Sequence, residues 1–401
     1  MCGICAAIQK TKITGINETF YSVFDTTIVR SLYYRGGYSM KKTIALILSL
    51  VTLFCAVSVF SASAKKSEYK LYSYKDYEYF YRGDGVQIFD YYGTQSKLKI
   101  PSKINGHKVV KIGYDGSEDE KQYFFYLPAE SWWYYGFWHN EYIEEVTIPD
   151  TVTALSGECF KCCPRLKKVN LGKGLKSLDN CEFSGCEKLR SLKLPESLES
   201  FATDSIENTN ITKLSFGKNL RKFDGEFGGA QLAFVSVSRD NKNFASEKGA
   251  LYDKAKTKLV YYPCENKNKA LKLPDGITKL DSTTISFTNL KSITLPKKLS
   301  RICNSAIYCN EKLTQLKFSG KNKIRVDRYA VFNCKRLTSV KIPKNVVKIG
   351  KKAFGFWEYE YKKNGKEKWV DKKVKGFTIR GKKNSAAYKY ARKYGFKFIE
   401  I

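Results

Sequence analysis

Residues 337–354 read Leu337-Thr-Ser-Val-Lys-Ile-Pro343-Lys-Asn-Val-Val-Lys-Ile349-Gly-Lys-Lys-Ala-Phe354 and contain the pattern that decides the fold. Apolar and polar residues alternate up to Ile342, which is the period of a strand with one buried face. Pro343 then ends the pairing and opens a turn, and a second apolar stretch follows up to Ile349. The segment therefore predicts two short strands joined by a turn, closed by the bulky side chain of Phe354.

The same unit recurs along the chain. The apolar residue that precedes Pro, Gly or Ser falls at positions 148, 171, 194, 216, 295, 318 and 342, so units follow each other every 22 to 24 residues except across one longer stretch. Several units end in a bulky apolar residue followed by Cys or Asn, as in Phe160 with Cys163 and Phe183 with Cys186. One such unit cannot bury its apolar face alone, so the units are expected to stack into a solenoid of roughly ten turns.

These motifs resemble the BspA-type leucine-rich repeat of secreted and surface proteins of host-associated bacteria. Residues 84–113 resemble the N-terminal cap unit of that family, residues 243–263 its recurrent hairpin, and residues 384–398 its closing helix and strand. The resemblance implies a right-handed, curved, β-rich leucine-rich-repeat solenoid of short parallel strands and few helices, with hairpin insertions and a short C-terminal helix. It also implies recognition or adhesion at cell surfaces and no catalytic residues.

The N-terminal region has the pattern of an export signal. Met40-Lys-Lys42 precedes an uncharged apolar run, and Ala62-Ser-Ala64 follows it. A basic head, an apolar run and an A-x-A exit indicate a signal peptide, with a retained signal anchor as the alternative. Because a signal peptide stands at the start of a protein, residues 1–39 are interpreted as an over-extended gene start. The chain is accordingly expected to be secreted or peripherally wall-associated, with no transmembrane segment after cleavage.

The remaining chain is divided by the repeats and their interruptions. The expected segments are a cap unit (65–113), an aromatic-rich insertion (114–142), repeats (143–237), a hairpin insertion (238–270), repeats (271–356), a basic hairpin insertion (357–374), and a closing strand and helix (375–401). The second hairpin is expected to turn at Asn364-Gly365, since Asn-Gly favours a tight hairpin turn.

The charge of the chain is unevenly distributed. Lys and Arg number 71 against 39 Asp and Glu, a net charge of +32, and residues 321–401 alone contribute 25 bases and 6 acids. Such an excess first suggests nucleic acid, but an exported protein does not meet genomic DNA, so nucleic acid is excluded as a partner. The expected partner is a protein or glycan at the cell surface, and residues 321–401 could hold an anionic wall polymer or an acidic host glycan. A surface that serves only solubility is the alternative.

Two groups of residues are candidate ligand contacts. The first lies in the aromatic insertion, where stacked rings could bind sugars and make the protein a carbohydrate-binding accessory protein; packing over the solenoid end is the alternative. The second comprises lysines at outward positions of the repeat strands, with a merely solvated face as the alternative. The candidates are Trp132, Trp133, Tyr134, Tyr135 and Trp138, and Lys168, Lys193, Lys213, Lys317 and Lys341.

Catalytic and cofactor chemistry is not expected. The chain has only 2 His, and no Ser–His–Asp or Cys–His set stands at a plausible position. The 9 Cys beyond residue 64 mostly occupy the inward Cys/Asn position of the repeat, so buried free thiols are expected rather than disulfides or a zinc site. The sequence thus predicts a non-enzymatic recognition or adhesion module without cofactor.

Overall fold

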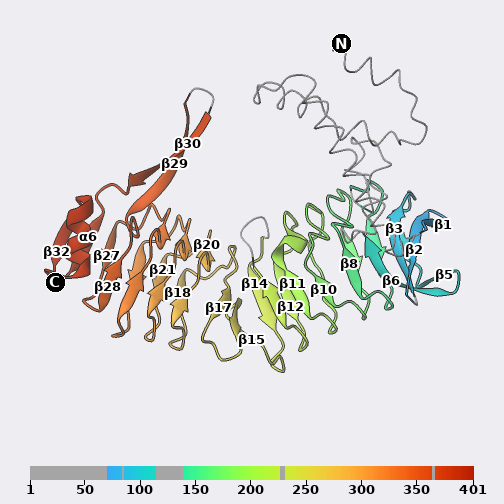
Figure 1. Ribbon diagram of the computed structural model, residues 1–401, viewed down its shortest axis with the longest axis horizontal. Helices are drawn as coiled ribbons and strands as arrows, with labels where there is room; N and C mark the ends of the chain where they lie inside the picture. Colours follow the sequence, from blue (N-terminus) through green and yellow to red (C-terminus); the bar gives the residue numbers. More distant parts are fainter. Residues whose placement is uncertain (1–69, 84, 114–136, 138, 226–230, 364–365) are drawn as a thin grey trace, which may run out of the picture. The chain divides into compact units, whose positions relative to one another are not determined.

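The computed structural model describes residues 70–83, 85–113, 137, 139–225, 231–363 and 366–401. The chain divides into two units at residues 68 and 69, and the structure describes only the second. The gene-start extension, the signal segment and the five aromatic candidates lie outside the described residues. The second unit is a β-solenoid of about 12 turns, whose short strands stand side by side in a row (Figure 1). The expected solenoid fold is confirmed. The number of turns is larger than the roughly ten expected, because closing strands that lack the Leu-x-x-Val spacing also add turns to the stack.

One face of the stack is formed by the strands of the Leu-x-x-Val-x-Ile motifs, and we call it the repeat-strand face. Its strands pair in parallel within groups β4-β7-β9, β12-β14, β18-β21-β24 and β27-β31-β32. They are β4 (Lys97–Lys99), β7 (Glu145–Thr147), β9 (Lys168–Asn170), β12 (Lys213–Phe216), β14 (Phe234–Val237), β18 (Ala270–Lys272), β21 (Ser292–Thr294), β24 (Gln315–Lys317), β27 (Ser339–Lys341), β31 (Thr378–Gly381) and β32 (Lys397–Glu400).

The strands after each Pro or Gly turn build a second face, which is also parallel from β6 onward. It contains β6 (His107–Gly113), β8 (Ala154–Ser156), β10 (Ser177–Leu178), β11 (Ser200–Ala202) and β13 (Lys222–Asp224), and then β19 (Lys279–Leu280), β22 (Arg301–Ile302), β25 (Ile324–Val326) and β28 (Val346–Ile349). A third, shorter row is formed by β20 (Ile285–Ser286), β23 (Ile307–Tyr308), β26 (Val331–Phe332) and the first residue of β29 (Phe356–Lys363).

Antiparallel elements cap and interrupt the stack. At the N-terminal end β1 (Tyr72–Tyr74), β2 (Tyr77–Arg82) and β3 (Gly85–Tyr91) form a meander that joins β6, with β5 (Lys103–Ile104) paired to β6. Strands β15 (Phe244–Glu247), β16 (Ala250–Asp253) and β17 (Leu259–Tyr261) form the first hairpin insertion. Strand β29 pairs with β30 (Lys366–Lys373) as a second hairpin that projects from the row of turns (Figure 1).

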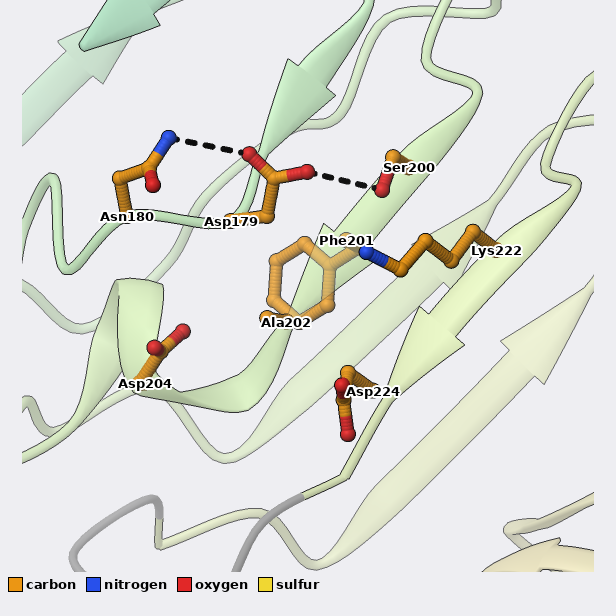
Figure 2. Close-up of a pocket in the computed structure, with 8 residues that line it drawn as sticks. All are labelled: Asp179, Asn180, Ser200, Phe201, Ala202, Asp204, Lys222 and Asp224. Carbon is orange, nitrogen blue, oxygen red and sulfur yellow. Dashed lines mark hydrogen bonds between the residues drawn. The ribbon is translucent and has the colours of Figure 1, made fainter. Parts of the chain in front are cut away.

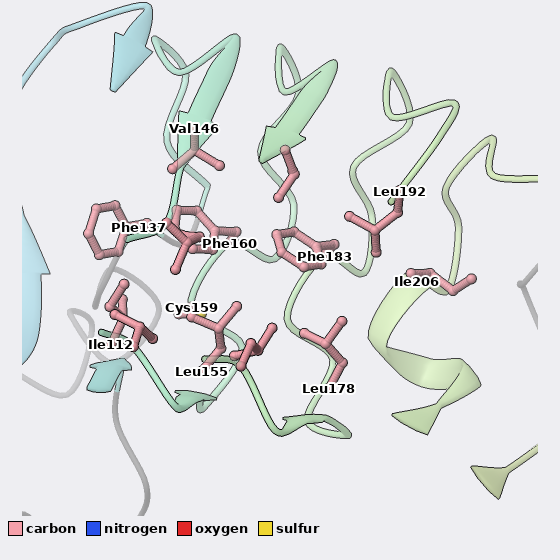
Figure 3. Close-up of a cluster of buried hydrophobic side chains, with 14 of the residues drawn as sticks. Ile112, Phe137, Val146, Leu155, Cys159, Phe160, Leu178, Phe183, Leu192 and Ile206 are labelled. Carbon is pink, nitrogen blue, oxygen red and sulfur yellow. The ribbon is translucent and has the colours of Figure 1, made fainter. Parts of the chain in front are cut away.

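The core runs through the inside of the turns. Apolar side chains from successive units stack on each other, and Figure 3 shows this for the turns between Ile112 and Ile206. The rings of Phe137, Phe160 and Phe183 are fully buried, with centroids 4.7 Å and 5.7 Å apart. Because each ring packs on the rings of neighbouring turns, stability comes from contacts between units, as expected for a repeat protein.

The Cys or Asn that ends a unit ties it to the unit before. The Sγ atoms of Cys163 and Cys186 each lie 3.0 Å from a backbone oxygen, of Phe137 and Phe160 respectively. Asn310 donates from Nδ2 to the Ile285 oxygen at 2.8 Å, which is the same link between consecutive turns. A buried carbonyl left without a donor is costly, so this position selects a small side chain that can donate.

All nine cysteines within the described residues are free thiols, as expected. They are not all buried, however: Cys162, Cys181, Cys264 and Cys309 are half-buried. Three of these four, Cys162, Cys181 and Cys309, have φ between 52° and 56°, the left-handed region of the backbone.

The C-terminal end is closed by the short helix α6 (Ala386–Tyr394). The Ser385 side chain accepts a hydrogen bond from the Tyr388 amide, and Gly395 ends the helix at φ 65°. These are standard N-terminal and C-terminal caps. Tyr390 reaches from the helix to the last repeat, where its hydroxyl donates to the Phe354 oxygen at 2.8 Å. The helix thereby covers the end of the core.

Candidate functional site

The repeat-strand face presents two outward side chains from a typical strand. The central residue of each strand is buried, as Val169, Leu316 and Val340 are, and the residues on either side point outward. All five candidate lysines are exposed: Lys168, Lys193, Lys213, Lys317 and Lys341. Four of them lie in repeat strands, whereas Lys193 lies in the segment 191–195, which is not a strand. The sequence pattern therefore predicted the exposure of these side chains, and their role as ligand contacts stays a prediction.

Acidic residues neutralise the bases at the N-terminal end of this face. Lys168 forms an ion pair with Glu145 at 2.6 Å, in the adjacent strand. Glu144 in the same turn pairs with Lys167 at 2.7 Å and with Arg165. Hydrogen bonds from Lys167, and then from Arg165, lower the pKa of the Glu144 carboxyl. Lys168 is consequently the least available of the five candidate lysines for a ligand.

The C-terminal half of the face carries a row of bases without such partners. Its third strand position is occupied in successive turns by Lys272, Thr294, Lys317, Lys341 and Arg380, which we call the basic lane. The strand register pairs Lys272 with Thr294, Thr294 with Lys317, and Lys341 with Arg380. All four bases are exposed, and no ion pair within the described residues involves any of them.

The neighbouring lane of the same face is small and polar. It contains Ala270, Ser292, Gln315, Ser339 and Thr378 in successive strands. Neighbouring strands in a sheet are about 4.8 Å apart, so the basic lane is a line of closely spaced positive charges bordered by hydroxyl groups. Like charges on neighbouring strands repel each other.

The repeat motif did not predict two members of the basic lane, Lys272 and Arg380. Lys272 follows Asn268-Lys269-Ala270, which lacks the leading Leu or Ile of the motif, and Arg380 follows the second hairpin insertion. A signal was nevertheless present, because Leu271-Lys272-Leu273-Pro274 keeps the apolar-polar-apolar ending of a repeat strand. This ending alone, without the leading Leu or Ile, is sufficient to indicate that Lys272 lies in a repeat strand.

Bases also line up on the second face. Lys279, Arg301, Arg325 and Lys348 follow each other in register. Here acids compensate the first two: Lys279 lies 2.7 Å from Asp281, and Arg301 lies 2.9 Å from Asp327. Arg325 and Lys348 extend the positive surface toward the C-terminal end.

A hollow of about 240 Å³ lies at the ends of β10, β11 and β13 and is acidic. Its lining includes Asp179, Asp204 and Asp224 from three successive turns, together with Lys222 (Figure 2). Burial raises the pKa of Asp204. No group of three or more His, Cys, Asp or Glu within the described ranges could hold a metal ion.

Next to this hollow lies a fully buried acid, Glu182. Its carboxyl oxygens accept hydrogen bonds from the backbone amides of Asp179, at 3.0 Å, and Asn180, at 3.2 Å. Burial raises the pKa of Glu182 to about 7, although these hydrogen bonds oppose the change. The residue fixes the turn after β10 and faces the core.

Comparisons with known proteins agree with the fold. Residues 133–227 and 258–360 match the BspA type leucine rich repeat region in six copies. No curated protein matches the chain. In the part of the chain that the structure describes, none of the helices is long and apolar enough to cross a membrane.

Several solved structures are similar. The pneumococcal vaccine antigen PcpA has a TM-score of 0.50 at 17% identity, covering 83% of this chain and 98% of that one. A leucine rich cell surface protein from Faecalibacterium prausnitzii has a TM-score of 0.41 at 18% identity, with 69% and 90% covered. A leucine-rich repeat protein from Eubacterium ventriosum has a TM-score of 0.43 at 17% identity, with 70% and 87% covered. At these identities the likeness shows the fold alone.

Proposed function

This chain belongs to the BspA-type leucine-rich repeat proteins, and on that premise we propose that it is an exported, non-enzymatic recognition or adhesion module of the bacterial surface. Its ligand is an anionic polymer, held by the C-terminal half of the repeat-strand face. Export rests on the signal pattern of residues 40–64. The cell surface is also where the similar protein from Faecalibacterium prausnitzii is described.

The single observation that carries the proposal is the basic lane. Lys272, Lys317, Lys341 and Arg380 are exposed on consecutive or nearly consecutive turns and have no ion-pair partner within the described residues. One exposed ion pair contributes only about 0 to 1 kcal/mol. When a polymer contacts several such charges at once, each further contact forms within the same complex and adds to the affinity. A row of individually weak contacts can therefore hold the polymer.

The composition of the face favours a polymer over a folded protein. Binding energy at protein interfaces concentrates in Trp, Tyr and Arg. The basic lane and the lane beside it hold lysines, hydroxyl residues, one Gln, one Ala and a single Arg. Lysine ammonium groups and hydroxyls suit the oxygens of phosphate, sulfate or carboxylate groups.

The proposal is tested by binding of the full chain to long-chain polyphosphate, a linear polyanion without sugar or side chains. The test variant Lys317→Ala/Lys341→Ala removes two charges of the basic lane. The control Lys168→Ala/Lys176→Ala removes two exposed charges that are paired with Glu145 and Glu199.

We expect the test variant to bind five- to tenfold more weakly, and the control to stay within twofold of the wild type. Binding should weaken steeply with salt, because the Debye length falls from about 10 Å at 0.1 M to about 3 Å at 1 M. Equal losses in the two variants would show that total charge, and not the basic lane, holds the polymer.

A further inference from the structure

The second hairpin, β29–β30, is fixed at its base by two acids that point toward the solenoid. Glu358 accepts hydrogen bonds from the Tyr308 hydroxyl at 2.8 Å and from Asn333 at 2.9 Å. Asp371, on the facing strand, accepts one from the Tyr329 hydroxyl at 2.9 Å and forms an ion pair with Lys352. The hairpin is therefore held in one orientation before any ligand arrives, which reduces the entropy lost on binding.

Its other face carries a row of rings. Side chains alternate along a strand, so Trp357, Tyr359 and Tyr361 share the face opposite Glu358. The register places Lys372, Val370 and Lys368 of β30 directly across from them. We call these six residues the aromatic strip. The centroids of Trp357 and Tyr359 are 6.3 Å apart, and those of Tyr359 and Tyr361 are 5.9 Å apart.

Ammonium groups border the rings. Lys372 Nζ lies 3.9 Å from the centroid of the Tyr359 ring, and Lys335 Nζ lies 4.5 Å from that of Trp357. Both lysines are exposed, so each presents part of its charge to solvent beside a ring. Such cation–π contacts hold the lysines near the rings without neutralising them.

Exposed apolar side chains also lie on the hairpin. Of the eight large hydrophobic residues exposed within the described ranges, three lie on this hairpin: Tyr359, Trp369 and Val370. Trp369 is on the opposite face, in the register partner position of Glu360, and is 62% exposed. Exposed apolar clusters of this kind mark interaction sites.

We propose that the aromatic strip binds an acidic polysaccharide, that is, a sugar chain that carries carboxylate groups. The apolar C–H face of a pyranose packs on the rings, and the carboxylates pair with Lys372, Lys368 and Lys335. The rings follow one another along a strand, which suits a linear chain. This inference names the chemical class of the polymer in the proposed function and rests on that function in requiring an anionic chain.

The size of the strip favours a sugar chain over a protein. Five paired residues, 357–361 with 368–372, at about 3.4 Å each give a length of about 17 Å, and two strands are about 10 Å wide, or on the order of 170 Å². A stable protein interface needs about 800 Å² from each partner. A second copy of the chain would also bring its own lysines against those of the strip, so it is disfavoured by charge.

The experiment compares three probes on the full chain: hyaluronan, which has sugar rings and carboxylates; dextran, which has sugar rings alone; and polyphosphate, which has charge alone. The test variant is Tyr359→Ala/Tyr361→Ala. Tyr359→Phe/Tyr361→Phe keeps the rings, and Trp369→Ala removes an exposed ring from the opposite face of the same hairpin.

We expect the alanine pair to weaken hyaluronan binding at least tenfold and polyphosphate binding by less than twofold. The phenylalanine pair and Trp369→Ala should keep wild-type hyaluronan affinity, and dextran should bind far more weakly than hyaluronan. Unchanged hyaluronan affinity in the alanine pair, or an equal loss in Trp369→Ala, would overturn the inference. Failure of the proposed function has a different signature, namely polyphosphate binding that is insensitive to Lys317→Ala/Lys341→Ala.

Discussion

The buried Glu182 makes the stability of this protein depend on pH in a defined direction. Burial raises the pKa of its carboxyl to about 7 from an ordinary value of 4.5. The folded state therefore holds this proton more tightly than the unfolded state does. The resulting stabilisation is present at low pH and is lost as the pH rises through the interval between those two values.

The size of the effect follows from the same shift. One pKa unit corresponds to about 1.36 kcal/mol, so ionised Glu182 at high pH makes the folded state about 3 kcal/mol less stable than protonated Glu182 does. Most of that loss, about 2 to 3 kcal/mol, falls between pH 5.0 and pH 8.5. Glu182→Gln removes the titration while keeping an oxygen that can accept from the Asp179 or Asn180 amide.

The assay is urea unfolding followed by circular dichroism at pH 5.0 and pH 8.5. The free energy of unfolding should fall by about 2 to 3 kcal/mol more in the wild type than in Glu182→Gln over this interval. Glu187→Gln, a matched change at an exposed acid five residues along the chain, should behave as the wild type. An identical pH dependence in wild type and Glu182→Gln would refute the reasoning, because it would show that Glu182 is ionised in the folded core.

Further predictions concern packing, capping and export. Phe160→Ala should lower the free energy of unfolding by about 3 to 5 kcal/mol in urea melts, since it opens a cavity between two buried rings; a loss below 1 kcal/mol would contradict the stacked core. Cys186→Ala removes the donor to the Phe160 carbonyl and should cost about 1 to 3 kcal/mol, with Cys186→Ser restoring part of that loss. Ser385→Ala should cost about 1 kcal/mol by loss of the α6 cap, visible as a lower urea midpoint. Mass spectrometry of the exported protein should find Lys65 as its first residue, and a peptide from 1–39 in the precursor would refute the gene-start hypothesis.

The sequence predicted those parts of the fold that repeat. Alternation around residues such as Val169 and Val340, together with the constant spacing of the units, determined which side chains face the core and which face solvent. The hairpin turning after Lys363 was also predictable, because Asn-Gly favours such a turn. Burial of an acid was not predictable, since Glu182 follows a turn like many solvated acids and its environment depends on the turns before and after it.

The sequence predicted that the candidate lysines face solvent, but it did not predict which of them have an ion-pair partner. Lys168 takes the first outward position of its strand and Lys317 the second, and the sequence predicts that both face solvent. Only the stacking register reveals that Glu145 lies beside Lys168, whereas Lys317 is flanked by Thr294. An ion pair between units depends on which residues the stack brings side by side. Lys168 and Glu145, for example, are 23 residues apart in the sequence.

The most direct test of the central claim is lysine footprinting in the presence of polyphosphate. The full chain is acetylated briefly with and without the polymer, and modification of each lysine is quantified by mass spectrometry. We expect strong protection of Lys272, Lys317 and Lys341 and little protection of Lys168 and Lys193, which lie in the N-terminal half. Protection spread evenly over all exposed lysines, or concentrated in the N-terminal half, would contradict it.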